Sequence, residues 1–347
     1  MTIPFRYFPY LVQQLVMDHM DFIDVFSLYF ASEKSKTLVK SFFNRQECEL
    51  IYDLDTVKPR ILINKRKSLE NYHYKTRNQV AIVPKLHAWK HVYLFCSFMT
   101  IETEQFQITV ESCDDMYKGL MRFVRELFPK IHFSFEFGPS PLEVIRRNMR
   151  IAKALNVPIE RVKIGGKYWW KETIKEKRMR ACLKEYSDVK TLIVNVSPSD
   201  FQYDFQTNPP FKFDLFKLSA ARWVTKDHLI NLFLGCKKVY LRDYRGMSYT
   251  ELELMEICEK WLEAPETQYL GIQFSQSFSE GIGKLPGAVP LREANADYPC
   301  FGHRMKLDPG KGYMMKKADG TPAIVYHDRS NIVFRTDFEN AVVDGTF

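Results

Sequence analysis

The sequence predicts an α/β protein that begins with three short helices, continues as irregular strand–helix units and ends in a small antiparallel β meander. Three observations predict this class. Apolar residues recur at helical spacing near the N-terminus, paired apolar residues alternate with helical segments in the middle, and a turn joins two apolar strands near the C-terminus. The 347 residues, 46% of them hydrophobic, suffice for one large core or for two or three smaller units.

Residues 8–43 are predicted to form the three N-terminal helices. The first helix begins near Phe8-Pro9, because proline is favoured at the first positions of a helix. Its apolar residues recur at helical spacing: Leu11, Val12, Leu15, Val16 and Met20. The second helix, about 22–30, is apolar on nearly every side, and Ser32 can cap the third. A segment this short cannot bury so many apolar side chains by itself, so we expect a partner to cover it.

Residues 46–111 form a segment of short apolar runs, which predict strands. The runs are ELIYDL, RILI, QVAIV, HVYLFCSF and FQITV. A basic polar loop, residues 64–79, lies between them. The sequence assigns no role to this segment.

Residues 112–278 alternate between strand and helix patterns. Apolar pairs mark six successive strands: Phe133/Phe135, Val162/Ile164, Leu192/Val194, Phe216/Leu218, Val239/Leu241 and Leu270/Ile272. The first members of successive pairs are 23 to 31 residues apart, and a helical segment fills most of these intervals. Units of about this length are typical of leucine-rich-repeat solenoids, although an ordinary α/β sheet with helices of similar length fits the same pattern.

Helix caps support two of these units. Thr225 and Ser248 each stand seven residues after the last residue of an apolar pair, and both residue types favour the N-cap position. Glu251 lies three residues after Ser248 and predicts a capping box there. We therefore expect helices over 226–234 and 249–263.

Residues 279–347 are expected to form a linker and a β meander. The opening stretch, SEGIGKLPGAVPLREANADYP, is rich in Gly and Pro and is predicted to be a link. In GYMMKKADGTPAIVYHD, two strands flank a turn at Ala318-Asp319-Gly320. NIVFRTDF supplies a third strand.

Motifs for catalysis or metal binding are weak. His87 and His91 are four residues apart and Cys96 follows, but this segment runs into a predicted strand, where that spacing separates residues by about 13 Å. In GIGKLPG, residues 281–287, no Ser or Thr follows the Lys as a P-loop requires. We therefore expect no catalytic residue, no metal site and no cofactor, and the chain is predicted not to be an enzyme.

Charge and cysteine content bear on partners and location. Lys and Arg exceed Asp and Glu by 50 to 42, a mild basic excess that permits nucleic acid without requiring it. Seven cysteines without a CxxC motif suit reduced thiols, so we expect a cytoplasmic or nuclear protein. Neither a signal peptide nor a membrane-spanning run is predicted.

The opening segment resembles an F-box. The matches are Phe8-Pro9 at the usual Leu-Pro, Leu11/Val12 and Leu15/Val16 at the apolar positions of its first helix, Met20-Asp21-Phe22 at the Leu-Asp-Pro junction, and Ser27-Leu28 with Ser32 through Leu38 near its end. The sequence departs from the motif where Phe22 replaces Pro and where Lys34-Ser35-Lys36 replaces Trp-Arg. The nematode branch of the family resembles this sequence in having Lys-Ser-Lys at the second of these places.

Three later stretches are similar to the type 2 F-box-associated region: FKLSAARWVTKDHLINLF, ELMEICEKWLEAPETQYLGIQF and the closing GYMMKKADGTPAIV. The chain thus resembles an F-box protein of the nematode-expanded family. In that family the F-box (here residues 1–45) binds a Skp adaptor and the rest of the chain holds a target. The resemblance therefore implies a non-catalytic substrate receptor of a Skp–cullin–F-box (SCF) ubiquitin ligase.

Two sets of site residues follow. The resemblance assigns adaptor binding to Phe8, Pro9, Leu11, Val12, Leu15, Val16, Met20, Phe22, Val25 and Leu28. Side chains alternate along strands, so the neighbours of the apolar pairs are expected on an open sheet face. Its predicted target-binding residues are Lys163, Asn195, Lys217, Tyr240, Arg242 and Gln273. Centred on Tyr240 and Arg242, this face is expected to bind acidic groups of an unknown protein target.

Two other functions stay open. The chain could bind the adaptor without delivering a target for ubiquitination. It could also bind nucleic acid through the basic segments 64–79 and 167–180, the second of which mixes Trp with Lys and Arg.

Overall fold

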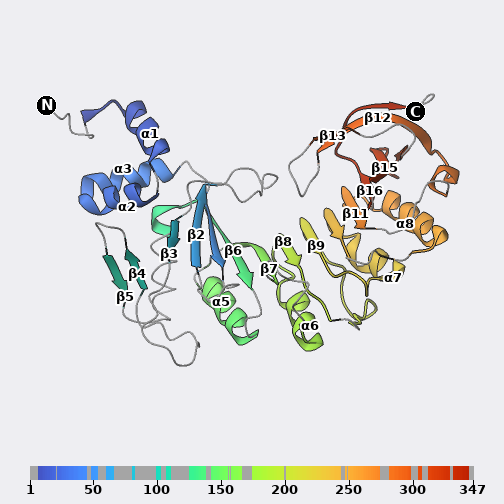
Figure 1. Ribbon diagram of the computed structural model, residues 1–347, viewed down its shortest axis with the longest axis horizontal. Helices are drawn as coiled ribbons and strands as arrows, with labels where there is room; N and C mark the ends of the chain where they lie inside the picture. The colour runs from blue at the N-terminus through green and yellow to red at the C-terminus, as the bar shows by residue number, and fades with distance from the viewer. Residues whose placement is uncertain are drawn as a thin grey trace. The chain divides into compact units, whose positions relative to one another are not determined.

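The chain is a mixed α/β protein. The computed structural model (Figure 1) describes residues 7–20, 22–44, 48–53, 60–65, 80–82, 99–102, 107–110, 125–137, 142–154, 156, 158–165, 174–198, 201–243, 247, 249–273, 281–297, 304–306, 312–328 and 331–343. It divides into two compact units, one ending at Glu160 and one beginning at Arg161. Among the described residues, no helix is both long and apolar enough to cross a membrane.

The first unit opens with the three predicted helices. They are α1 (Tyr10–His19), α2 (Phe22–Ala31) and α3 (Glu33–Phe43). Ser32 caps α3 as expected, because its side chain accepts a hydrogen bond from the backbone N–H of Ser35 at 3.1 Å. The apolar side of α3 is buried through Val39, Phe42 and Phe43.

A small mixed sheet follows in the same unit. Its strands are β1 (Cys48–Asp53), β2 (Arg60–Lys65), β3 (Val80–Ile82) and β6 (Ile131–Phe137), in the order β6-β1-β2-β3. A separate hairpin pairs β4 (Met99–Glu102) with β5 (Gln107–Val110), and α5 (Leu142–Ala154) follows β6. β1 runs parallel to β6, so the segment of unassigned role supplies a strand beside the first apolar pair.

Several sequence-based expectations lie outside the described residues. They concern most of the basic loop 64–79, the run 91–98, most of the helix expected after Ser112, and Ser140 as the cap of α5.

In the described part, Phe43 of α3 packs against Phe128, with ring centroids 4.3 Å apart. Lys40 of α3 also donates a hydrogen bond to Glu126. These contacts join the three helices to the segment that precedes β6.

The second unit begins with five parallel strands. They are β7 (Ile159–Ile164), β8 (Thr191–Val194), β9 (Leu215–Leu218), β10 (Lys238–Leu241) and β11 (Tyr269–Gln273). The apolar pairs predicted from the sequence stand in register across all five. Val162 aligns with Leu192, Leu192 with Phe216, and the same row continues through Val239 to Leu270. All of these pair residues are buried.

Helices connect the parallel strands. α6 (Glu176–Glu185) lies between β7 and β8, α7 (Lys226–His228) with the π-helical segment η3 (Leu229–Phe233) lies between β9 and β10, and α8 (Glu251–Glu263) precedes β11. Figure 1 shows these helices following one another along the same side of the strands. The aligned strands and helices suit both a repeat-like array and an ordinary α/β sheet, so that alternative stays open.

One predicted cap is wrong. The N-cap of α8 is Thr250, whose side chain accepts a hydrogen bond from the backbone N–H of Glu253 at 3.2 Å. Glu253 completes the capping box by accepting from the backbone N–H of Thr250 at 2.8 Å. The sequence offers two overlapping boxes, and the helix begins at the second rather than at Ser248 with Glu251.

The C-terminal strands extend the same sheet. β16 (Asn331–Arg335) pairs antiparallel with β11, and the order continues through β15 (Pro322–Asp328), β14 (Gly312–Lys316) and β12 (Val289–Asp297) to β13 (Arg304–Lys306). The unit therefore contains a ten-stranded sheet, and β17 (Glu339–Val343) pairs with β12. The predicted Gly/Pro-rich link is thus partly wrong, because β12 and the short helical turn η4 (Ile282–Lys284) lie within it.

The antiparallel strands also cover part of the sheet. A buried cluster joins residues of β10 and β11 with residues of β12, β15 and β16: Tyr240, Tyr269, Leu291, Ile324, Tyr326 and Val333. Figure 1 shows β12 arching over β15 and β16. The face opposite the helices is therefore closed at β10 and β11.

Candidate functional site

An exposed apolar stripe runs along α1. Leu11 is 72% exposed and Leu15 is 60% exposed, while Val12 and Val16 are each 38% exposed. The opposite side of α1 faces inward, where Met17 is fully buried. Gln13 is also buried, and its side-chain amide donates to the carbonyl of Phe8 at 2.8 Å. The buried side fixes the orientation of the helix, so the stripe faces outward.

The other predicted adaptor residues differ in exposure. Pro9 is exposed, and Phe8, Met20 and Leu28 are half-buried. Val25 is only 2% exposed, so its assignment to the adaptor surface is wrong. It belongs to the core of the three-helix segment, where an apolar helix must turn part of its surface inward. The side chain of Phe22 lies outside the described residues.

Part of the predicted target-binding face lies on β7, β8 and β9, where its side chains are partly accessible. Lys163 and Lys217 stand in one row across these strands with Ile193 between them, and all three side chains are half-buried. Arg242, just after β10, is exposed. Positive charge therefore gathers along this part of the sheet.

Tyr240 does not belong to this open face. Its side chain is only 4% exposed, and it lies in the cluster under β12, β15 and β16. The C-terminal strands were predicted to form a separate meander, but they pack over β10. The expected centre of the target site is therefore wrong at Tyr240. The ammonium group of Lys217 lies 5.4 Å from the centre of its ring.

Asn195 acts between strands. Its side-chain amide donates to the carbonyl of Gly165 at 3.3 Å, and its side-chain oxygen accepts from the hydroxyl of Ser219 at 3.0 Å. These bonds connect the ends of β7, β8 and β9, so the side chain of Asn195 has a structural role. Gln273, the last of the predicted target residues, is half-buried at the end of β11.

A cavity of about 570 Å³ that was not predicted from the sequence lies beyond the carboxyl ends of β8 and β9. Its lining residues are Arg180, Phe201, Gln202, Tyr203, Asp204, Arg222, Trp223, Thr225 and His228. Ligands of open α/β sheets usually bind at this edge. The signal in the sequence was the long connection between β8 and β9, which carries four buried aromatic residues: Phe201, Tyr203, Phe211 and Phe213.

Hydrogen bonds brace the cavity. The backbone N–H of Thr225 donates to Nδ1 of His228, so this nitrogen is unprotonated and Nε2 donates to the carbonyl of Tyr203 at 2.7 Å. The carboxylate of Asp204 accepts from the Thr207 hydroxyl and from the backbone N–H of Gln206. The first of these bonds is the main reason why the pKa of Asp204 is lowered. Burial raises the pKa of the Tyr203 hydroxyl.

The described parts of the chain add no evidence for a metal site or a nucleic-acid site. These parts contain no group of three or more His, Cys, Asp or Glu that could hold a metal ion. His87, His91 and Cys96 lie outside them, as do the first residues of the basic segment 167–180. In its described part, Arg180 is paired with Glu176.

Comparisons with known proteins leave the family open. The chain matches no protein-family model, no curated protein and no solved structure. The resemblance to F-box proteins therefore stays a hypothesis.

Proposed function

We propose that this chain is a non-catalytic substrate receptor of an SCF ubiquitin ligase. The observation that carries the proposal is the apolar stripe of α1, formed by Leu11, Val12, Leu15 and Val16. These four residues are among the ten that the resemblance assigns to the Skp adaptor. A contiguous exposed apolar patch on a folded protein usually marks an interaction site.

The orientation of α1 supports this role. Met17 and Gln13 occupy the inward side of the helix, so the stripe cannot turn inward without exposing a buried methionine. A partner helix or groove would remove the stripe from water and gain the corresponding apolar burial. The stripe thus fits a docking surface that a partner completes.

The target is proposed to bind the open part of the sheet face. Lys163, Lys217 and Arg242 place three positive charges on or beside it, with Ile193 as an apolar contact. This distribution favours a protein target that presents acidic groups. In this proposal the chain positions a target for modification and needs neither an active site nor a cofactor of its own.

The test places a charge in the stripe. We expect Leu15→Asp and Val12→Asp to abolish recovery of a Skp adaptor in pull-downs, because an unpaired charge in a desolvated apolar interface costs several kcal/mol. Gln14→Asp is the matched control, since it adds the same charge to the same helix outside the stripe. Thermal unfolding of all three variants is expected to resemble that of the parent. Full adaptor recovery by both stripe variants would rule the proposal out.

Mass spectrometry of the purified complex separates the remaining functions. Adaptor together with cullin supports a ligase receptor, whereas adaptor alone indicates a complex without a ligase role. Co-purifying nucleic acid, released steeply as salt rises, would instead support nucleic-acid binding.

A further inference from the structure

The cavity beyond β8 and β9 has an aromatic floor. The rings of Phe201 and Trp223 meet edge to face with centroids 4.9 Å apart, and the Tyr203 ring lies 6.1 Å from Phe201. All three residues are buried. The indole N–H of Trp223 is also buried and has no acceptor among the described residues, so this wall holds a donor without a partner. An aromatic floor suits an apolar or planar ligand better than an ion.

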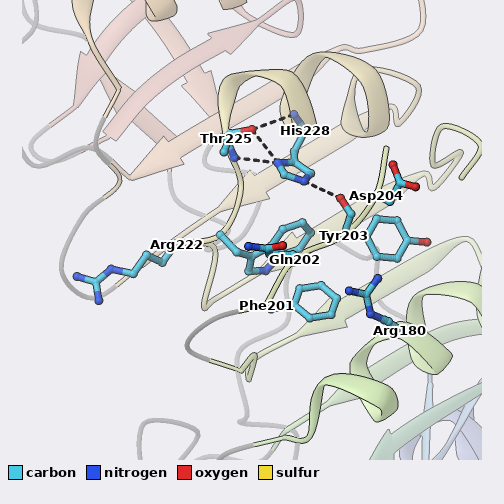
Figure 2. A pocket seen from close by; sticks show the side chains of 9 residues that line it. Arg180, Phe201, Gln202, Tyr203, Asp204, Arg222, Thr225 and His228 are labelled. Atoms are coloured by element: carbon cyan, nitrogen blue, oxygen red, sulfur yellow. Dashed lines mark hydrogen bonds between the residues drawn. The ribbon is translucent and has the colours of Figure 1, made fainter. Parts of the chain in front are cut away.

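Arg180 adds a planar surface to this floor. Its guanidinium carbon lies 5.5 Å from the centre of the Phe201 ring. Figure 2 shows the guanidinium group beside the rings of Phe201 and Tyr203. Guanidinium groups are planar and stack on aromatic faces, so Arg180 adds a planar cationic group beside these rings.

Two of the three charged side chains that line the cavity are held by hydrogen bonds. Arg180 donates two hydrogen bonds to one carboxylate oxygen of Glu176, at 2.9 and 2.5 Å. Asp204 is held by its own turn through Gln206 and Thr207. Figure 2 shows the side chain of Arg222 extending away from the aromatic rings. The cavity therefore offers no concentrated charge for a phosphate or a metal ion.

The rim is polar and the site is preformed. Gln202, Asp204, Arg222 and Thr225 are exposed around the buried rings. The bond from His228 to the carbonyl of Tyr203 holds the 201–204 segment against α7. An apolar centre with a polar rim is the usual anatomy of a protein interface, and a braced pocket loses little entropy when it is filled.

We propose that this cavity is the anchor pocket for one aromatic side chain of a peptide or protein partner. The ring of the partner stacks against the aromatic floor and the guanidinium plane of Arg180. The polar rim, through Gln202 and Thr225, serves the backbone of the bound segment. This site goes beyond the proposed function, because it acts in the isolated chain whether or not α1 docks on an adaptor.

The probes are three acetylated and amidated pentapeptides, Gly-Gly-X-Gly-Gly, with Tyr, Phe or Leu at the central position. Saturation-transfer NMR with the full chain measures their binding. We expect the Tyr and Phe peptides to bind about three- to tenfold more tightly than the Leu peptide, the range that specific aromatic contacts supply. Equal binding of all three, or binding of none at millimolar peptide, would overturn the proposal.

Variants locate the binding. Gln202→Trp is expected to fill the mouth of the cavity and to abolish the aromatic preference, and Arg180→Lys is expected to weaken it because charge remains without a planar surface. Gln206→Trp adds the same ring on the same loop outside the cavity, and Lys177→Ala removes a charge from α6 outside it; both should bind like the parent. If Gln202→Trp binds like the parent while remaining folded by circular dichroism, the peptides bind elsewhere and the assignment is wrong.

The outcome is separate from that of the adaptor test. Loss of adaptor binding in Leu15→Asp concerns α1 alone, while the peptide titration concerns only the cavity in the second unit. Either proposal can therefore fail without the other.

Discussion

At the scale of single residues, Lys317 is a buried cation of the second unit. It is only 4% exposed, and its ammonium group donates to the carbonyls of Ala264 and Thr267 just after α8. The same group lies 4.6 Å from the centre of the Trp261 ring. Burial lowers the pKa of Lys317 from 10.5 to about 8.

This lowered pKa makes stability depend on pH. The unfolded chain binds a proton at Lys317 up to about pH 10.5, whereas the folded chain releases it near pH 8, so stability rises with pH between these values. Relative to Lys317→Met, the parent is expected to gain about 2 kcal/mol in free energy of unfolding between pH 7.5 and 9.5. Urea unfolding of both proteins at the two pH values measures this gain. A difference that does not change with pH would contradict the lowered pKa.

The sequence predicted the hairpin around Lys317 but not its burial. The turn at Ala318-Asp319-Gly320 is confirmed, with Gly320 at a φ of 85°, a value that favours glycine. Lys316 and Lys317 are identical in type, yet Lys316 is exposed and Lys317 is buried. Alternation along the strand sends the two side chains to opposite faces, and only the packing of α8 decides which face is buried.

At the scale of the element, the start of α8 shows why helix boundaries are hard to predict. Ser248 and Thr250 are both followed by Glu after three residues, so local chemistry permits two starts. In the structure, Thr250 is the N-cap of α8. By contrast, the cap of α7 was predicted correctly, since the side chain of Thr225 accepts a hydrogen bond from the backbone N–H of His228.

The two candidate caps can be distinguished by substitution. Thr250→Ala is expected to lower the free energy of unfolding by about 1 kcal/mol, because it removes the acceptor for the Glu253 N–H. Ser248→Ala is the matched control and should change it by less than about 0.5 kcal/mol. Urea unfolding monitored by circular dichroism measures both. A larger loss for Ser248→Ala would show that α8 begins earlier.

At the scale of the whole molecule, the sequence predicted the parallel strands better than the surface that they present. The apolar pairs were correct because burial on the helix side depends on local alternation. The exposure of Tyr240 was wrong because it depends on Leu291, Ile324 and Tyr326, far along the chain. The cavity was missed for a similar reason, since Arg180 and Trp223 come together only in the folded unit.

The burial of Tyr240 predicts a stability effect. Tyr240→Ala is expected to lower the free energy of unfolding by about 3 kcal/mol, since it leaves a cavity in the cluster beneath the C-terminal strands. Lys163→Ala, in the same row of the sheet but outside that cluster, should change it by less than about 0.5 kcal/mol. Denaturant unfolding measures both variants. Equal stability of Tyr240→Ala and the parent would place the ring in solvent.

The curl of β12 to β16 over β10 and β11 also limits how the array of strands can change in length. A row of parallel strands grows most simply by adding units at its end, and an open end invites another chain to pair with it. Here that end is occupied by antiparallel strands that close on the array and finish in β13, which has only three residues. Duplication of a strand–helix unit beyond β11 would displace this closure and expose Tyr240 and Tyr269. Insertions that preserve the fold are therefore restricted to the interior of the array, upstream of β10. There they would lengthen the basic face without disturbing the antiparallel strands that cover its end.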